Sequence, residues 1–346
     1  MKKKGKKILF ILLFVIILCV VAYIFITKYY KKNENGKENN EEKVVEVKNK
    51  EELKIVDINS NSRPIAIMIN NLNVARGYQS GLQDAYIVYE MIVEGGITRL
   101  MAVFKDKDIS RVGPVRSSRD YYLDYALEND AIYVHFGWSP QAKKDISSLG
   151  VNNLNGLYDE FYWREDLPIA YEHTAFTSMK NINKYANNKG YRSTTNKDLL
   201  LKYSSEEVDL SELNNHKSAN SIDIKYSYSS TTNYVYNKKE KVYYRSTNDV
   251  AQTDYVTKKQ LTAKNIIIAY ASNEAVNNDS KGRQTLNNIG SGSGYYITDG
   301  YAVPINWTKS SRSAQTVYTY KDGEQITVND GNTYIQIAPI NSATIK

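Results

Sequence analysis

The chain has 346 residues, of which 42% are hydrophobic and 24% are charged, and this composition is typical of a globular protein rather than a disordered one. It contains one cysteine, which excludes an intramolecular disulfide and cysteine-based metal sites. The formal net charge is +7, but eight of the 45 basic residues lie in residues 1–32, which contain no acidic residue. The rest of the chain carries 37 basic against 38 acidic side chains, so the excess of positive charge belongs to the N-terminal end.

The N-terminal end is predicted to anchor the protein in a membrane, with residues 1–7 as a basic cytoplasmic tip and residues 8–27 as the span. Ile8–Ile26 contains 19 residues without a charge, long enough to cross a hydrocarbon core of about 30 Å. Five lysines precede this stretch and three follow it, which predicts an N-terminus inside the cell and an extracellular remainder. Two alternatives stay open, a cleaved signal peptide and a lipoprotein cut before Cys19, although Leu18 stands where a small residue is expected.

The remainder divides into a stalk and two globular regions. Residues 28–62 are rich in Asn, Glu and Lys and have few apolar side chains, so we expect a flexible stalk. A mixed α/β domain is predicted over residues 63–195, a connection over 196–221, and a mainly antiparallel β domain rich in Tyr and Lys over 222–346. The expected fold class is α+β behind a single N-terminal transmembrane helix.

In the first domain, strand and helix patterns alternate. Short apolar runs predict buried strands. A tight glycine turn at 94–96 is expected to join two extended or partly helical segments, and Ser followed by an acidic residue or a proline marks helix starts. The expected strands are Ile65–Ile69 and Ala131–Phe136, the joined segments are Ala85–Val93 and Thr98–Phe104, and the expected helices follow Ser117–Asp120 and Ser139–Pro140.

In the second domain, short segments rich in Tyr, Val, Ile and Thr alternate with Asn, Asp and Gly, which predicts an antiparallel sheet or a partly closed barrel. Asp322–Gly323 is typical of a tight hairpin turn. Two interpretations of the glycine-rich run Gly290–Gly294 stay open: a place where the backbone approaches a ligand closely, or a flexible hairpin connection. It is not a P-loop, because no lysine follows the last glycine.

Several stretches in order resemble the YerB-like family of bacterial cell-envelope proteins, which is defined by domains of unknown function. They are RPIAIMINN, SGLQDAYIVYEMIVEGGITRLMAVF, VGPVRSSRDYYLDYA, AIYVHFGWSP, TAKNIIIAY, SGSGYYITDG, VPINWTK and TVYTYKDGEQITVNDGNTYIQIAPI. The resemblance covers roughly residues 63–340 and implies a lipoprotein or a membrane-anchored protein. It supplies no reaction. Two features depart from the family: the small residue before Cys19 is missing, and Glu172 precedes His173 where a proline is usual.

A candidate anion site is predicted in the first domain, because guanidinium groups, hydroxyls and a helix start occur together. The alternative is that Arg116 and Arg119 pair with Glu90, Glu94 or Asp120 and only stabilise the domain. His135 or His173 as a base and Ser117 as a nucleophile would make the region catalytic, but no spacing requires it. The candidate residues are Glu94, Arg99, Arg116, Ser117, Arg119, His135 and His173.

A candidate polymer-binding surface is predicted in the second domain, where tyrosines and basic residues interleave and residues 215–346 carry 15 basic against 10 acidic side chains. The alternative is that the tyrosines reflect β propensity and half-burial. The candidate residues are Lys225, Tyr228, Lys238, Lys239, Lys241, Tyr243, Arg245, Lys281 and Arg283.

No catalytic residue is assigned, and no metal or cofactor is expected, because the three histidines are far apart in sequence and form no metal motif. The favoured hypothesis is a non-catalytic, membrane-anchored extracellular protein that binds an anionic polymer, namely DNA, teichoic acid or peptidoglycan. The alternatives are an enzyme that modifies cell-wall polymers through the region of Arg116, Arg119, His135 and His173, and an envelope scaffold that recruits another protein or forms a homodimer.

Overall fold

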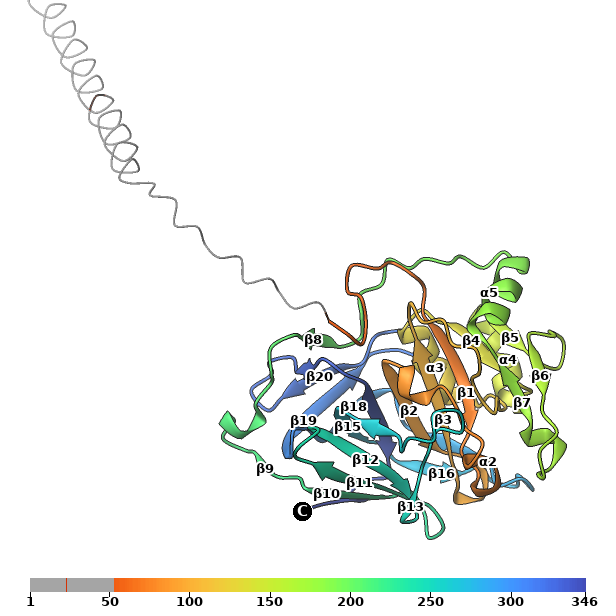
Figure 1. Ribbon diagram of the computed structural model, residues 1–346. Coiled ribbons are helices and arrows are strands. Elements are labelled where there is room, and N and C mark those ends of the chain that lie inside the picture. The colour runs from red at the N-terminus through yellow and green to blue at the C-terminus, as the bar shows by residue number, and fades with distance from the viewer. Residues whose placement is uncertain (1–22, 24–52) are drawn as a thin grey trace, which may run out of the picture. The chain divides into compact units, whose positions relative to one another are not determined.

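The computed structural model describes Tyr23 and residues 53–346, and the latter belong to one compact unit. The predicted basic tip, the predicted membrane span with Cys19 (apart from Tyr23), and residues 28–52 of the predicted stalk lie outside the described residues. Among the residues that are described, no helix combines the length and the apolar character needed to cross a membrane. The fold is a mixed α/β structure built mostly of strands (Figure 1).

One large mixed sheet forms the centre of the molecule, and its strands come from both predicted domains. In spatial order the strands are β20 (Val317–Tyr320), β19 (Tyr301–Lys309), β18 (Gly290–Thr298), β15 (Asn265–Tyr270), β22 (Thr333–Ala338), β2 (Ile87–Ile92), β3 (Thr98–Phe104), β1 (Ile65–Asn70), β4 (Ile132–His135) and β5 (Asn153–Asn155), and β9 (Lys217–Ser218) pairs with β19.

Strand β22 joins the two halves of this sheet, because it lies between β15 and β2 and pairs with both in parallel orientation. The expectation of an all-antiparallel sheet in the second region is therefore wrong at this strand. The other pairings along the sheet from β15 to β20 are antiparallel. A strand from near the C-terminus thus pairs with β2, which in turn pairs with β3.

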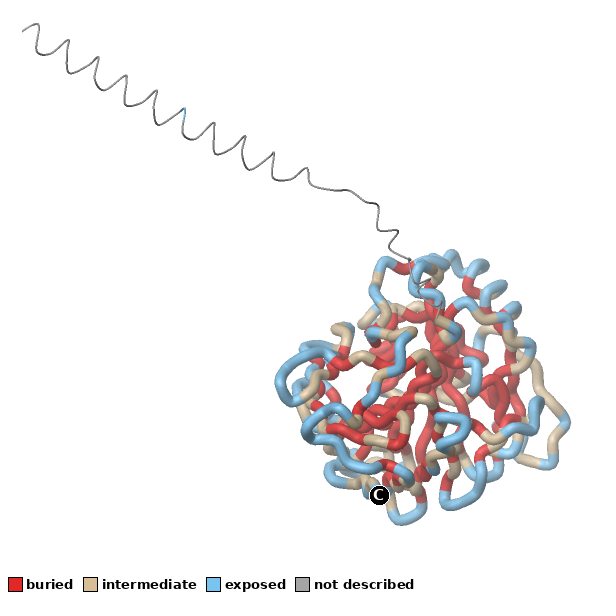
Figure 2. Tube along the Cα trace, turned by 60° about the vertical axis from the view of Figure 1, so that its left-hand side comes forward, coloured by how far each residue is buried: buried red, intermediate tan, exposed pale blue. Residues whose placement is uncertain are grey.

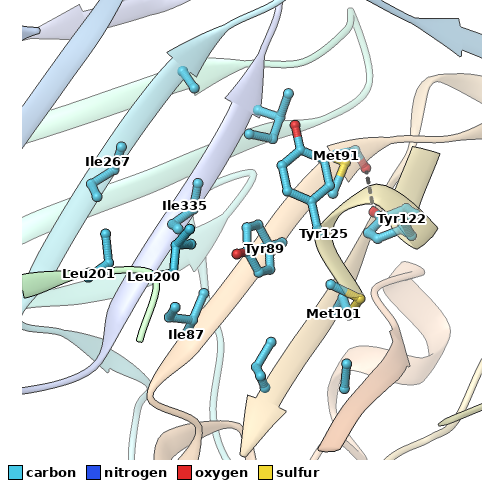
Figure 3. Close-up of a cluster of buried hydrophobic side chains, with 14 of the residues drawn as sticks. Ile87, Tyr89, Met91, Met101, Tyr122, Tyr125, Leu200, Leu201, Ile267 and Ile335 are labelled. Carbon is cyan, nitrogen blue, oxygen red and sulfur yellow. Dashed lines mark hydrogen bonds between the residues drawn. The ribbon is translucent and has the colours of Figure 1, made fainter. Parts of the chain in front are cut away.

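Both faces of the large sheet are buried, which explains why its central strands are continuous apolar runs. Along β1, Ala66 and Met68 face one hydrophobic cluster, while Ile65, Ile67 and Ile69 face another. The first cluster includes side chains of α3 and α4, and Figure 3 shows Tyr122 and Tyr125 of α3 packed over β2 and β3. The second cluster includes α5 and the second sheet.

The second sheet is antiparallel and covers part of the large sheet. Its strands in spatial order are β13 (Val250–Ala251), β12 (Val242–Thr247), β11 (Thr231–Asn237), β10 (Ser221–Lys225) and β23 (Ala343–Ile345), and β14 (Thr262–Ala263) pairs with β12. Three further pairs of short strands are β16 (Asn273–Ala275) with β17 (Gln284–Leu286), β21 (Thr327–Asn329) with β8 (Lys202–Ser204), and β6 (Tyr162–Arg164) with β7 (Ala175–Thr177).

The helices are short, and Figure 1 shows α3, α4 and α5 on the side of the molecule that holds β1, β4 and β5. Helix α4 begins as predicted, with Pro140 in its first turn and the Ser139 side chain accepting a hydrogen bond from the Ala142 amide. The prediction of a serine N-cap on α3 is wrong, because Arg119 occupies that position and makes no capping bond. The described helices are α2 (Asn73–Arg76), α3 (Asp120–Glu128), α4 (Pro140–Ser148) and α5 (Met179–Asn188), with 3-10 turns η1 (Leu82–Asp84), η2 (Glu94–Gly96), η3 (Tyr171–His173) and η4 (Leu210–Glu212).

Two polar segments pack more closely than the sequence predicts. Residues 53–62, expected to belong to the stalk, include the buried Val56, and the amide of Ile55 donates to the Asp330 carboxylate. The expected connection 196–221 buries Leu200 and Leu210 in the first hydrophobic cluster. Figure 2 shows the resulting arrangement, a buried interior surrounded by exposed loops. The globular part therefore begins before residue 63, and the connection is part of its core.

Candidate anion-binding site

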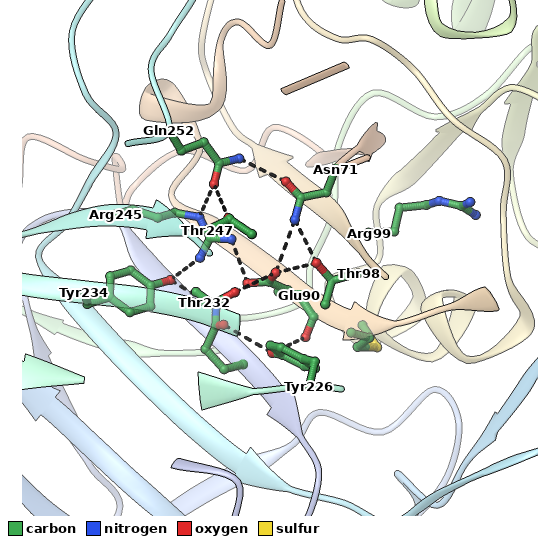
Figure 4. A network of polar contacts seen from close by, with 12 residues as sticks. Asn71, Glu90, Thr98, Arg99, Tyr226, Thr232, Tyr234, Arg245, Thr247 and Gln252 are labelled. Carbon is green, nitrogen blue, oxygen red and sulfur yellow. Dashed lines mark hydrogen bonds and ion pairs between the residues drawn. The ribbon is translucent and has the colours of Figure 1, made fainter. Parts of the chain in front are cut away.

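A buried ion pair, Glu90 with Arg245, lies between the two sheets (Figure 4). Glu90 Oε2 accepts from Arg245 Nη2 at 2.8 Å, and both side chains are fully buried. The remaining Glu90 oxygen accepts from the hydroxyls of Thr98 and Thr232, and the Arg245 guanidinium also donates to Tyr234 and Gln252. Arg245 therefore does not contact a polymer at the surface, which corrects the prediction for this residue.

Four arginines gather near the start of β3, and we call Arg99, Arg116, Arg119 and Arg283 the arginine cluster. Arg99 lies on β3, and Arg116 and Arg119 lie in the loop that leads into α3. This loop is fixed by the large sheet, because the amide of Arg116 donates to Met68 and its carbonyl accepts from Phe136. The structure thus brings together the three arginines that the sequence analysis selected in the first domain.

Arg99 is the innermost member of the cluster. It pairs with Asn70 across β1 and β3, it is 5% exposed, and its Nη1 donates to the carbonyl of Ser117 at 2.6 Å. Figure 4 shows its side chain pointing away from the Glu90 network. In the described part of the chain it forms no ion pair with a carboxylate. Burial, and then the positive charge of Arg119, lower the pKa of Arg99 to about 10, although the charge of Glu94 opposes this shift, so the charge of Arg99 is only partly balanced.

Glu94 lies between two of the arginines. It accepts a short hydrogen bond from Arg119 Nε, and Arg283 Nε lies 4.0 Å from the same oxygen. Burial favours a raised pKa for Glu94, but the hydrogen bond and charge of Arg119 hold the pKa below its usual value. Arg283 is itself paired with Asp279. The structure therefore places Arg283, predicted as part of the second-domain surface, beside the first-domain candidates.

Arg116 lies at the more exposed end of the cluster, next to His173. Its Nη1 donates to the carbonyl of Glu172 at 3.1 Å, and the Glu172 carboxylate, which is 63% exposed, lies 3.3 Å from Nη2. His173 Nδ1 lies 3.0 Å from the side-chain amide of Asn70. Burial, and then the charge of Arg116, lower the pKa of His173, so that residue is neutral near pH 7. Ser117 is half-buried in the same loop.

His135 does not join the cluster as a proton-transfer group. It is fully buried, with Nδ1 2.8 Å from the carbonyl of Gly137 and Nε2 3.0 Å from the side-chain oxygen of Asn153. Burial lowers the pKa of His135 to about 4. Its role is structural, and its assignment to a binding or catalytic site is wrong.

The predicted Tyr and Lys surface of the second domain is divided by the alternation of β-strands. Tyr243 and Arg245 point to the buried face of β12 and are fully buried, and the Tyr243 hydroxyl accepts from the amide of Gly300. Lys241 is exposed but paired with Glu207 at 2.6 Å. The predicted polymer-binding surface therefore combines residues from the buried face and from the exposed face of the sheet.

The remaining candidates are exposed but separated. Lys225 ends β10 and Tyr228 is 94% exposed in the turn that follows, whereas Lys238 and Lys239 lie beyond the far end of β11, a seven-residue strand of roughly 23 Å. Lys281 is exposed in another loop. These residues do not form one continuous stripe along the hairpin.

The glycine-rich run is neither a ligand loop nor a flexible connection, because it forms the first half of β18 paired with β19. A Cβ atom at Gly292 would lie 2.5 Å from the Trp307 indole nitrogen, and one at Gly294 would lie 1.8 Å from the Ile268 carbonyl oxygen. These glycines allow close packing of the central sheet.

Sequence reasoning missed Asn70 and Glu172 as neighbours of the arginines. Asn70 follows the predicted strand Ile65–Ile69 directly, and this position at the end of a buried strand is a signal for a site residue. The cluster presents several N–H donors with a partly exposed carboxylate, Glu172, that an incoming anion can displace. This arrangement suits recognition of a phosphate, sulfate or carboxylate group.

Comparisons with known proteins agree with this architecture. The DUF3048 N-terminal domain, described as a domain of unknown function, matches residues 53–192, and the DUF3048 C-terminal domain matches residues 222–335. A protein of Bacillus subtilis (strain 168) named "Putative lipoprotein YerB" is 35% identical over 290 residues, which cover 82% of this chain and 84% of that protein. A crystal structure of YerB from Bacillus subtilis superposes with a TM-score of 0.71 and 33% identity, covering 82% of this chain and 94% of that one. The chain belongs to the YerB-like family of proteins with DUF3048 domains, as its sequence motifs predict.

Proposed function

We propose that the protein is a membrane-anchored binding protein of the cell surface, and that the arginine cluster recognises an anionic group of an extracellular polymer. Teichoic acid, the peptidoglycan glycan and extracellular DNA are the polymers of suitable charge. The anchor is supported by the uncharged stretch Ile8–Ile26 and by the name of the Bacillus subtilis relative, "Putative lipoprotein YerB". Whether the anchor is a single helix or a lipid on Cys19, the globular part would face the same polymers.

The main observation in support of this proposal is the buried and incompletely paired charge of Arg99. Arg99 is 5% exposed, lies near Arg119 and forms no ion pair with a carboxylate among the described residues, so the nearby charge of Glu94 compensates its positive charge only in part. A bound anion would compensate it through charge-assisted hydrogen bonds. Arg116 and Arg283 are more exposed and would make the first contacts.

The enzyme hypothesis has less support, because one of its two histidines is excluded by geometry. His135 is held at both ring nitrogens and has a pKa of about 4. His173 remains, but its Nδ1 faces Asn70. Among the described contacts, no other group that could act as a base lies next to the hydroxyl of Ser117. Binding without catalysis therefore explains more of the site.

A sedimentation experiment tests the proposal. The full-length protein in detergent micelles is mixed with isolated bacterial cell walls, with walls from which the phosphate polymers have been extracted by acid, and in parallel with double-stranded DNA. Arg116→Gln is the test variant, because Arg116 is partly exposed and its ion pair contributes little to folding. Arg192→Gln is the matched control, since Arg192 is a half-exposed arginine paired with Asp130 outside the cluster.

We expect the wild-type protein to bind at least one of these polymers, with an affinity that falls steeply as salt increases. Arg116→Gln should weaken that binding several-fold, and Arg192→Gln should not. Loss of binding on the extracted walls would identify a phosphate polymer. Absence of binding to all three materials at low salt, or equal binding by the two variants, would contradict the proposal.

A further inference from the structure

A shallow hollow of about 540 Å³ lies next to the arginine cluster, and we call it the Trp138 hollow. Trp138, Tyr158, Lys143 and Asn155 are among the residues that line it. The Trp138 segment forms a β-bridge with Ser118, so the hollow adjoins the loop that carries Arg116 and Arg119. No residue of the arginine cluster lines the hollow, which makes it a separate candidate site.

Two aromatic rings give the hollow its character. The rings of Trp138 and Tyr158 are tilted by 44° with centroids 5.7 Å apart. Tyr158 is 69% exposed, and Trp138 is partly exposed while packed against the buried His135 at 5.6 Å. Rings that are supported on one side and open on the other offer apolar faces, on which the C–H face of a sugar ring or the plane of a base can stack.

A buried amide supplies a second, independent observation. Asn155 is 1% exposed, and its side-chain oxygen accepts from the amides of Gly137 and Leu157 at 2.9 and 3.1 Å. Its Nδ2 is buried and has no hydrogen-bond partner in the described part of the chain. An unpaired buried donor costs about 1–3 kcal/mol, so an acceptor oxygen from a ligand at this wall would be stabilising.

The charges at the hollow favour a sugar over a nucleic acid as its ligand. Lys189 is paired with Asp159 at 2.7 Å, which leaves Lys143, 5.7 Å from the centroid of the Trp138 ring, as the cation without such a pair among the described lining residues. Nucleic acids bind where several cations meet successive phosphates, and a carboxylate such as Asp159 opposes this. A nearly neutral hollow with amide groups and two aromatic faces suits a sugar ring with hydroxyl or acetamido groups.

We propose that the Trp138 hollow binds a saccharide ring of a surface glycan. The ring stacks on Trp138 and Tyr158, one of its oxygens accepts from Asn155 Nδ2, and Lys143 faces any carboxylate that the sugar carries. This site goes beyond the anion-binding proposal and stands without it. Occupied together, the hollow and the arginine cluster would recognise a glycan that carries anionic groups.

Calorimetric titration of the full-length protein with N-acetylchitotetraose, a neutral tetrasaccharide with acetamido groups, tests this proposal. The detergent must lack a sugar headgroup, so that it does not compete. Tyr158→Ala is the main variant because Tyr158 is exposed, and Tyr228→Ala is its control, an exposed tyrosine that does not line the hollow. Trp138→Phe provides a second measurement, since it removes the indole whose fluorescence the sugar would alter while keeping a ring.

We expect the tetrasaccharide to bind and to change the tryptophan emission, with the emission change lost in Trp138→Phe. Tyr158→Ala should weaken binding about tenfold, while Tyr228→Ala should bind as the wild type does. Absence of binding by the wild-type protein, or equal binding by Tyr158→Ala, would overturn the proposal. Binding of a single-stranded oligonucleotide that depends on Tyr158, without saccharide binding, would assign the hollow to bases instead. None of these outcomes involves Arg116, so they are independent of the cell-wall experiment.

Discussion

The Glu90–Arg245 pair and the arginine cluster both contain buried guanidinium groups, but they differ in whether each guanidinium has a carboxylate partner. Arg245 is fully buried, faces a carboxylate, and donates from all three of its nitrogens to described partners. Arg99 is almost as buried, but among the described residues its side chain donates to the backbone carbonyl of Ser117 and forms no ion pair with a carboxylate. The difference indicates that Arg245 holds the fold together and that Arg99 has capacity left for a ligand.

Removing the carboxylate of the Glu90–Arg245 pair should give the largest effect on stability. Glu90→Ala leaves the Arg245 guanidinium buried without its counter-charge, and also removes the acceptor of Thr98 and Thr232. We expect the free energy of unfolding to fall by about 3–5 kcal/mol. Chemical denaturation followed by circular dichroism measures it.

Glu240→Ala serves as the control for this prediction, because Glu240 is an exposed glutamate that accepts from Tyr244. Its effect should remain within about 0.5 kcal/mol. If Glu90→Ala were as mild as Glu240→Ala, the pair would not join the two halves of the fold, and the contrast with the arginine cluster would fail.

Protonation of His135 at low pH should lower the free energy of unfolding by an amount similar to the effect of Glu90→Ala. Its pKa is about 4 in the folded protein against 6.5 for the ordinary imidazole, so between these pH values the unfolded chain binds a proton that the folded chain does not. Stability contributed by neutral His135 is present above pH 6.5 and is lost as the pH falls to 4, by about 3 kcal/mol.

The His135 effect is measured as the difference in pH dependence between the wild-type protein and His135→Asn, because buried carboxyl groups titrate in the same range. The variant should lose this part of the slope, while His216→Asn, which changes an exposed histidine, should keep it. An unchanged slope in His135→Asn would mean that His135 is accessible and would return it to the list of catalytic candidates.

The sequence predicts those parts of the molecule whose signals are local. Strands β1 and β4 are apolar runs, and α4 has its Ser139 and Pro140 start, so each was placed within a residue or two. The position of β22 between β15 and β2 could not be predicted, because a parallel pairing depends on partners far away in sequence.

The candidate site divides in the same way. Arg99, Arg116 and Arg119 were selected together because they lie within about 20 residues of one another around one turn and one loop. Arg245 was misplaced because its partner Glu90 is 155 positions away, and nothing in the pattern of β12 shows which face is buried. The Trp138 hollow escaped prediction since Trp138 and Tyr158 meet only through the fold.

Arg119→Gln should have an intermediate effect, since this arginine is shared between structure and site. It loses the hydrogen bond to Glu94 and the bond from Nη1 to the carbonyl of Ser118. The Arg119 and Glu94 side chains are partly buried, and we expect a loss of about 1–2 kcal/mol in the free energy of unfolding. A loss as large as that of Glu90→Ala would show that Arg119, like Arg245, is a structural residue and not part of a binding site.

Arg116→Gln should have the smallest effect on folding. Its partner Glu172 is 63% exposed, and exposed ion pairs contribute little. We expect a change within about 0.5 kcal/mol by the same denaturation experiment. A larger loss would show that Arg116 is a structural residue, and its use as the test variant for binding would then have to be given up.

The central claim, that the arginine cluster is an open anion site, is tested most directly by salt dependence. The affinity of the full-length protein for the polymer that it retains is measured over a range of salt concentrations, for the wild type and for Arg116→Gln. If Arg116 contacts an anionic group, the slope of log affinity against log salt should become shallower by about one in the variant. Parallel slopes, with Arg192→Gln behaving in the same way, would show that the anion binds elsewhere.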